Sequence, residues 1–219
     1  MAKKYQAIET KVHWITWTSI ILVLVTIFTL LIVIQPSDKE VFYSKYQAIN
    51  AMNPDFSKKL PEENKYQLVS TLEDEWFGLQ KGVYSYASRT DHVTVVFFGH
   101  PENQNSGTHI ANAYVRLYGS SKVSPVIEPS KLYQGLGDEK VSIFYYEVRP
   151  THFTELVDNL NDHFEDAGIS AADIPLVVAF LDNEVLAYDV LSGEDVANIL
   201  RDFYNEVFAH EKVEALIQG

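Results

Sequence analysis

The stretch that most limits how this chain can fold is Trp14–Ile34, 21 residues without a charged side chain. As an α-helix this stretch would be about 31 Å long, which matches the roughly 30 Å hydrocarbon core of a bilayer. Trp14 and Trp17 lie at its start, where amphipathic rings favour the membrane interface. The sequence therefore predicts a transmembrane anchor.

Two alternatives explain the apolar stretch less well. A cleaved signal peptide has an apolar region of about 7–15 residues and small residues at its cleavage site. Here the stretch is longer and Gln35-Pro36-Ser37 follows it. A core helix of a globular domain is rarely apolar on all sides over such a length. An uncleaved anchor is the favoured interpretation.

Charge around the anchor predicts its orientation. Lys3, Lys4 and Lys11 precede it, and fewer positive charges follow closely. Positively charged flanks stay in the cytoplasm. We therefore expect a single-pass protein of the cell membrane, with residues 1–13 in the cytoplasm, 14–34 in the membrane, 35–65 as a connector, and 66–219 as a domain outside.

The charge balance restricts the partners of that domain. The formal net charge is −13, and residues 1–13 carry three lysines against Glu9, which is +2, so the remainder carries −15. With no basic stripe to neutralise phosphates, nucleic acid is not an expected partner. Anionic lipid head groups are unfavourable for the same reason. A hydrophobic content of 47% argues against wholesale disorder.

Helical and strand periodicities alternate through the domain. The segment 35–65 shows helical spacing at Val41, Phe42, Lys45, Tyr46 and Ile49 and leaves open whether it forms a stalk or packs on the domain. Thr71 resembles a helix cap before an apolar side at Leu72, Trp76 and Leu79, and residues 119–140 resemble a loop with a helical turn at Ser130–Tyr133. Ser192–Asp195 has the form of a capping box for the last helix. The other predicted elements are strands at Tyr66–Leu72, Val93–Phe98, Val141–Val148, Leu176–Leu181 and Glu184–Val190, and helices at Ile110–Leu117, His152–Asp166 and Val196–Val207.

The apolar strand ending in Gly99-His100-Pro101 and the polar tetrad Asn103-Gln104-Asn105-Ser106 resembles the strand and active-site loop of thioredoxin-like proteins. In that resemblance the two family cysteines fall on Asn103 and Ser106, and Ile174-Pro175 matches the cis-proline loop. It covers about residues 66–210 and implies an α/β fold with a mixed central sheet flanked by helices. Membrane-anchored thioredoxin-like proteins of Gram-positive bacteria, including bacteriocin transport accessory proteins, are the most similar group.

The departure from the family determines the expected function. The chain contains no cysteine, and disulfide exchange needs sulfur on both sides of the transfer. We therefore expect a redox-inactive domain that binds a protein or peptide as a chaperone-like or scaffolding module. The resemblance implies a groove lined by Gly99, His100, Pro101, Glu102, Ile174 and Pro175, in which a partner pairs through its backbone. An alternative is that Pro175 only shapes the start of its strand.

Two other functions compete with binding. A hydrolase or transferase would use Ser106, Glu102 or His100, but serine at a helix start is more often a capping residue. A weak cation site would use Asp158, Asp162, Glu165, Asp166 and Asp173, although a solvated helix face explains these acids as well. His100 and His109 match no metal-binding spacing. The sequence predicts no catalytic residue, metal or cofactor.

Overall fold

The computed structural model describes residues 13–52, 59–122, 126–165, 167–193 and 195–218. The chain divides into two compact units, Met1–Glu40 and Val41–Gly219. The second unit is the domain. The lysines that predict the orientation lie outside the described residues.

The first unit contains helix α1, Trp14–Ile34. Its window Trp14–Leu31 has a mean hydropathy of 2.2, and among the described residues this is the helix long and apolar enough to cross a membrane. The hydroxyls of Thr18, Ser19, Thr26 and Thr29 each donate to the carbonyl four residues earlier, at 2.8–3.1 Å. These bonds satisfy the polar groups of the helix internally, as an apolar environment requires.

The domain is built on a mixed sheet. Within the described residues it has five strands in the order β1-β3-β2-β4-β5. Strands β1, β3 and β2 are parallel, whereas β4 is antiparallel to β2 and β5 is antiparallel to β4. Each residue of the central β2 is buried, as its apolar sequence predicts. The strands are β1 Gln67–Val69, β2 Val93–Gly99, β3 Val141–Glu147, β4 Leu176–Leu181 and β5 Glu184–Val190.

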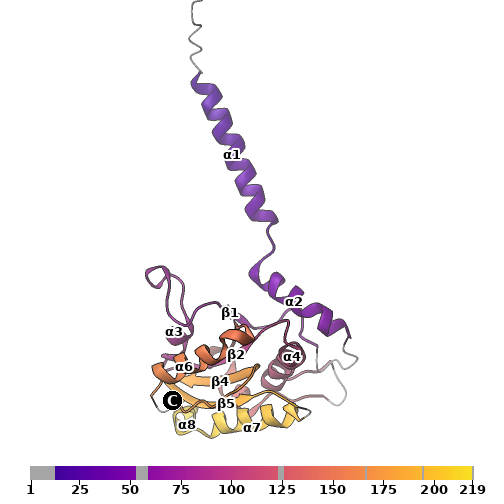
Figure 1. The fold of residues 1–219 in the computed structure, drawn as a ribbon, viewed down its shortest axis with the longest axis vertical. Helices are drawn as coiled ribbons and strands as arrows, with labels where there is room; N and C mark the ends of the chain where they lie inside the picture. The colour runs from indigo at the N-terminus through magenta and orange to yellow at the C-terminus, as the bar shows by residue number, and fades with distance from the viewer. Residues whose placement is uncertain (1–12, 53–58, 123–125, 166, 194, 219) are drawn as a thin grey trace, which may run out of the picture. The chain divides into compact units, whose positions relative to one another are not determined.

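Helices cover both faces of the sheet (Figure 1). Side chains alternate along β2, so that Val95 and Phe97 join the core beneath α4, α5, α7 and α8, and Val96 and Phe98 join the core beneath α3 and α6. The predicted α/β fold with a mixed, helix-flanked sheet is confirmed. The helices are α2 Asp38–Met52, α3 Val83–Ala87, α4 Gln104–Tyr118, α5 Lys131–Lys140, α6 Phe153–His163, α7 Val196–Ala209 and α8 Glu211–Gln218.

Part of the predicted connector packs on the domain. Phe42 and Tyr46 of α2 and Leu60 are buried in the same core as β2. The Tyr46 hydroxyl donates to the Tyr145 hydroxyl at 2.7 Å, and the Tyr145 hydroxyl donates to the Gly99 carbonyl at 3.2 Å. The sequence leaves open whether this segment is a stalk or packs on the domain, and Phe42, Tyr46 and Leu60 pack on the domain. The side chain of Ile49 lies outside the described residues.

The prediction of a helix that begins after Thr71 is wrong. Residues 74–81 form a loop with a short 3-10 turn at Trp76–Gly78, and helix α3 begins only at Val83. The Thr71 hydroxyl has no hydrogen-bond partner among the described residues, so it caps nothing. Asp74 instead accepts from the Gly82 backbone N–H at 2.8 Å, which places the helix start eight residues later.

Three other helix predictions are also corrected. Residues 119–140 include a ten-residue helix, α5, whose Leu132 and Leu136 are buried and whose glycines hid its pattern. The capping box before α7 does not form as predicted, because Asp195 is the N-cap and makes no side-chain cap bond, while Glu194 lies outside the described residues. Helix α6 ends at His163 rather than Asp166, which is also outside them.

Candidate functional site

The candidate site lies at the edge of the sheet where the parallel strands end. Gly99, the last residue of β2, pairs with Glu147, the last residue of β3. Because β4 is antiparallel and its Leu176 pairs with Phe98, Pro175 comes level with Gly99 on the other side of β2. Ligands of open α/β sheets bind at this kind of edge. The predicted loop and the predicted cis-proline segment therefore lie together.

Asn103 and Ser106 hold the loop closed through a set of hydrogen bonds, here called the Asn103–Ser106 clip. Asn103 is the N-cap of α4, and its side-chain oxygen accepts from the Ser106 backbone N–H at 2.9 Å and from the Ser106 hydroxyl at 3.2 Å. The Ser106 hydroxyl in turn accepts from the His100 backbone N–H at 3.2 Å. The positions that resemble the family's cysteines thus contact each other directly.

The clip decides which predicted residues reach solvent. Ser106 is completely buried and His100 is 8% exposed. Glu102 and Gln104 are exposed, and Pro101 and Asn105 are half-buried. A partner at this edge would therefore contact Glu102 and Gln104 rather than the residues that make the clip.

A network of contacts around the Glu147 carboxylate extends the site to α2. Glu147 bonds Lys45 Nζ at 2.7 Å, and its other carboxylate oxygen lies 3.8 Å from His100 Nε2. His100 Nδ1 accepts from the Glu102 backbone N–H at 3.2 Å, which leaves Nε2 to carry the proton toward Glu147. Loop, strand and α2 are joined through this carboxylate.

Below the network, the buried tyrosines Tyr46 and Tyr145 connect α2 to Gly99. Burial raises the pKa of both hydroxyls well above the usual value. They therefore stay protonated at neutral pH and serve as hydrogen-bond donors to the strand end, with no role as bases.

The cis-proline expected from the resemblance is confirmed: the Ile174–Pro175 bond is cis. The Ile174 side chain is fully buried, and its backbone N–H donates to the carboxylate of Asp173 at 2.8 Å. The Pro175 carbonyl accepts from the Leu191 backbone N–H at 2.9 Å. Because the Ile174 backbone N–H is already bonded to Asp173, a partner segment that pairs with this N–H would have to displace the Asp173 carboxylate.

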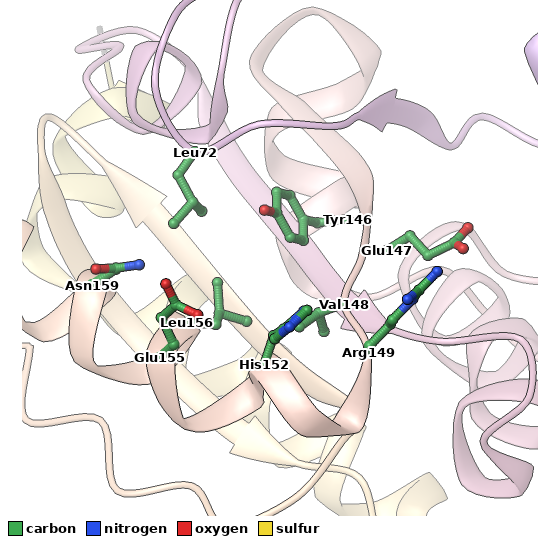
Figure 2. Close-up of a pocket in the computed structure, with 9 residues that line it drawn as sticks. All are labelled: Leu72, Tyr146, Glu147, Val148, Arg149, His152, Glu155, Leu156 and Asn159. Atoms are coloured by element: carbon green, nitrogen blue, oxygen red, sulfur yellow. The ribbon is translucent and has the colours of Figure 1, made fainter.

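A pocket that the sequence analysis did not predict lies next to the end of β3, where Glu147 pairs with Gly99. It has a volume of about 350 Å³ and lies between β3, the start of α6 and the loop after β1. Figure 2 shows Leu72 and Tyr146 facing Glu155 and Leu156 of α6 across it. The signal available in the sequence was the polar run after the strand at Val141–Val148. The lining residues are Leu72, Tyr146, Glu147, Val148, Arg149, His152, Glu155, Leu156 and Asn159.

The geometry does not bring together the residues of the alternative enzyme. The Ser106 hydroxyl bonds Asn103 and the His100 backbone, while the His100 ring contacts Glu102 and Glu147. His109 Nδ1 lies 3.4 Å from the side-chain nitrogen of Asn112. A nucleophilic serine needs a base that takes its proton, and Ser106 donates to an amide oxygen instead. Ser106 acts in the first turn of α4, as the capping alternative predicts.

The acidic residues of α6 lie on its outer side. Asp158 and Asp162 of α6, and Glu165 and Asp173 beyond its end, are all exposed, and Asp166 lies outside the described residues. In the parts of the chain that the structure describes, no group of three or more histidines and acids is placed to hold a metal ion.

Comparison with known proteins finds matches among solved structures. No protein-family model matches the sequence, and no curated protein matches it. Among solved structures, the thioredoxin Mala s 13 of Malassezia sympodialis is 12% identical with a TM-score of 0.36, covering 65% of this chain and 93% of its own. Of the features that the sequence resemblance implies, the structure contains the mixed sheet, the loop at the start of α4 and the cis Ile174–Pro175 bond.

Proposed function

We propose that this protein is a membrane-anchored, redox-inactive thioredoxin-like module outside the cytoplasm that binds extended protein segments at the edge formed by the β2–α4 loop. The observation that carries the proposal is the Asn103–Ser106 clip. It replaces a reactive pair by side chains that hydrogen-bond each other and stabilise the loop.

The surface around the clip suits recognition without chemistry. Glu102 and Gln104 offer exposed polar groups, and the pocket beside Glu147 is large enough for a partner side chain. A segment in extended conformation would lie along the edge by backbone hydrogen bonds and place one side chain in the pocket.

Charge favours a basic partner. The chain outside residues 1–13 carries −15, and the pocket rim holds Glu147 and Glu155 beside Arg149 and His152. Acidic surfaces attract and orient cationic partners over distances of about a Debye length. An exported or membrane protein with a basic extended segment is the expected class of partner.

The test is site-specific photo-crosslinking in cells that make the full chain. Gln104 is the position for the photoreactive residue, because Asn103 caps α4 and Ile174 is fully buried, so substitutions there would disturb the fold. Lys122 is an exposed control beyond the far end of α4.

The proposal predicts a discrete crosslinked protein from Gln104 that is missing from Lys122, with the crosslinks mapping to a basic segment of that protein. Equal labelling from both positions, or none from Gln104 in a chain shown to be folded and in the membrane, contradicts it. A change in a small-molecule substrate that depends on the Ser106 hydroxyl would contradict it as well.

A further inference from the structure

The loop Glu75–Gln80, here called the aromatic loop, exposes large apolar side chains. Trp76 is 72% exposed, Phe77 109% and Leu79 89%. Single exposed apolar residues are ordinary, but a contiguous group at the tip of one loop marks a contact surface. Figure 1 shows this loop standing out from the body of the domain beside α3.

Hydrogen bonds hold the aromatic loop in this shape. Glu75 and Gln80 pair through their backbones at 2.9 and 3.2 Å. Asp74, just before the loop, accepts from the Gly82 backbone N–H at 2.8 Å and from the Ser85 hydroxyl at 2.7 Å. The exposure is therefore built into the fold.

The backbone at the tip is unusual for aromatic residues. Trp76 and Phe77 have φ angles of 54° and 58°, in the left-handed region that bulky residues seldom adopt. This conformation turns both rings away from the domain. Strain of this kind is retained where surrounding structure enforces it, and it accumulates at functional surfaces.

The aromatic loop leaves the same edge of the sheet at which the chain enters the domain. Strand β1, which precedes the loop, ends at Val69, the partner of Tyr146 near the end of β3. The residue after Tyr146, Glu147, binds Lys45 of α2 at 2.7 Å. The chain that follows α1 and the loop that exposes the rings therefore meet the domain at one edge.

The length of chain between α1 and the domain limits how far that edge can lie from the end of α1. Helix α1 ends at Ile34, and Phe42 is already packed in the core at 4% exposure. Even fully extended, this piece spans at most roughly 29 Å. A bilayer crossed by α1 is thus within reach of the edge that carries the aromatic loop.

We propose that Trp76, Phe77 and Leu79 insert into the interface of the same membrane that α1 crosses, which makes the aromatic loop a second, reversible membrane contact. Tryptophan and phenylalanine rings are suited to this depth of the bilayer. The inference rests on the proposed membrane anchor and adds an orientation of the domain on the membrane.

The charges around the loop select the lipid. Glu73, Asp74 and Glu75 precede the rings and Lys81 follows them, in a domain that is acidic as a whole. An anionic surface repels this region, so zwitterionic head groups are the expected ligand.

The test uses the full chain with Trp14→Phe and Trp17→Phe, which leaves Trp76 as the remaining tryptophan. The protein is reconstituted in phosphatidylcholine vesicles, and Trp76 emission is compared with and without brominated acyl chains that quench rings at the membrane. A matched variant carries Trp76→Phe and Val126→Trp, because Val126 is also exposed, at 57%, but follows α4 at the opposite edge.

Brominated lipid should remove most of the emission of Trp76 and leave that of the tryptophan at 126 unchanged, and phosphatidylglycerol in the vesicles should weaken the quenching of Trp76. Equal emission loss at both positions, or none at Trp76, overturns the inference. So does protection of Trp76 that rises with protein concentration, which indicates a second copy as the partner. Flotation separates the two proposals: a chain that fails to float with the vesicles has no anchor, whereas one that floats without quenching lacks only the loop contact.

Discussion

The loop between β2 and α4 and the loop between β1 and α3 leave the same edge of the sheet and differ in what they expose. The first is polar in sequence, yet Ser106 is fully buried and His100 nearly so. The second is rich in apolar residues, yet Trp76 and Phe77 project into solvent. Residue type alone would suggest the reverse arrangement.

Local hydrogen bonding accounts for the difference. In the first loop, Asn103 and Ser106 satisfy each other and the His100 backbone, so polar groups can be buried at little cost. In the second, the bond from the Gly82 backbone N–H to Asp74 comes just before α3, which begins only at Val83. The preceding residues therefore have no helix face to bury. The hydrogen bonds of a loop therefore determine which of its side chains remain exposed, and these exposed side chains indicate its function better than its composition does.

The largest effect is expected when the close approach at Gly99 is filled. A Cβ at this position would lie 2.6 Å from Phe97 Cε1 and 3.0 Å from the Ser106 hydroxyl. Gly99→Val should lower the free energy of unfolding of the full chain in detergent by about 3 kcal/mol through overpacking. Denaturant unfolding followed by tyrosine and tryptophan fluorescence measures it.

The matched control for Gly99→Val is Gln104→Val, which places the same side chain at the exposed first residue of α4. It should change the free energy of unfolding by no more than about 0.5 kcal/mol. Equal stability of the two variants would show that the loop is not closed against β2.

Removing the central hydroxyl of the clip should have the next largest effect. Ser106→Ala leaves the buried backbone N–H of His100 without its acceptor, which should lower the free energy of unfolding by about 2 kcal/mol. The exposed Thr108 hydroxyl bonds a helix carbonyl, and Thr108→Ala should be nearly neutral in the same measurement. A neutral Ser106→Ala would argue that the clip does not hold the loop.

Replacing the exposed rings should hardly affect folding. Because Trp76, Phe77 and Leu79 bury little apolar surface, changing all of them to serine should alter the free energy of unfolding by no more than about 0.5 kcal/mol. Thermal and denaturant unfolding in detergent both report this quantity. A large loss of stability would mean that these side chains pack on the domain, as the predicted helix required.

The smallest effect is a pH dependence at the base of the aromatic loop. Hydrogen bonds from the Gly82 backbone and the Ser85 hydroxyl hold the pKa of Asp74 below its usual 3.8. The carboxylate therefore supports the loop above that value, and this support is lost as the pH falls below 3.8 through the lowered pKa.

Trp76 emission in the variant without Trp14 and Trp17 should report loosening of the loop in this acidic range. Asp74→Asn keeps an oxygen acceptor but cannot titrate, so its emission should not follow the same transition. Identical titrations of the two chains would rule out Asp74 as the support.

The strands and the main helices could be predicted because strong apolar runs and helical stripes determine them locally. The Asp182–Asn183 turn, with φ angles of 54° and 58°, follows from residues that tolerate the left-handed region. Helix α5 was missed because Gly135 and Gly137 weaken its pattern, and Gly135 is favoured there by the close approach of Ile217.

The site was only partly predictable. The meeting of the β2–α4 loop with Pro175 follows from strand order, which the family resemblance supplied. The ion pair of Lys45 with Glu147 and the pocket around Tyr146 depend on contacts between residues far apart in sequence, which no local pattern encodes. The exposure of Trp76 depends on where Asp74 makes its bonds.

The proposed function rests on a thioredoxin-like frame in which the Asn103–Ser106 clip occupies the positions that resemble the family's two cysteines. The most direct test is the double variant Asn103→Cys/Ser106→Cys in the full chain, since these side chains already approach to 3.2 Å. We expect the two cysteines to form a disulfide and the double variant to accelerate insulin reduction by dithiothreitol, whereas each single variant and the unaltered protein should not. A double variant that folds but neither forms the disulfide nor accelerates the reaction would contradict it.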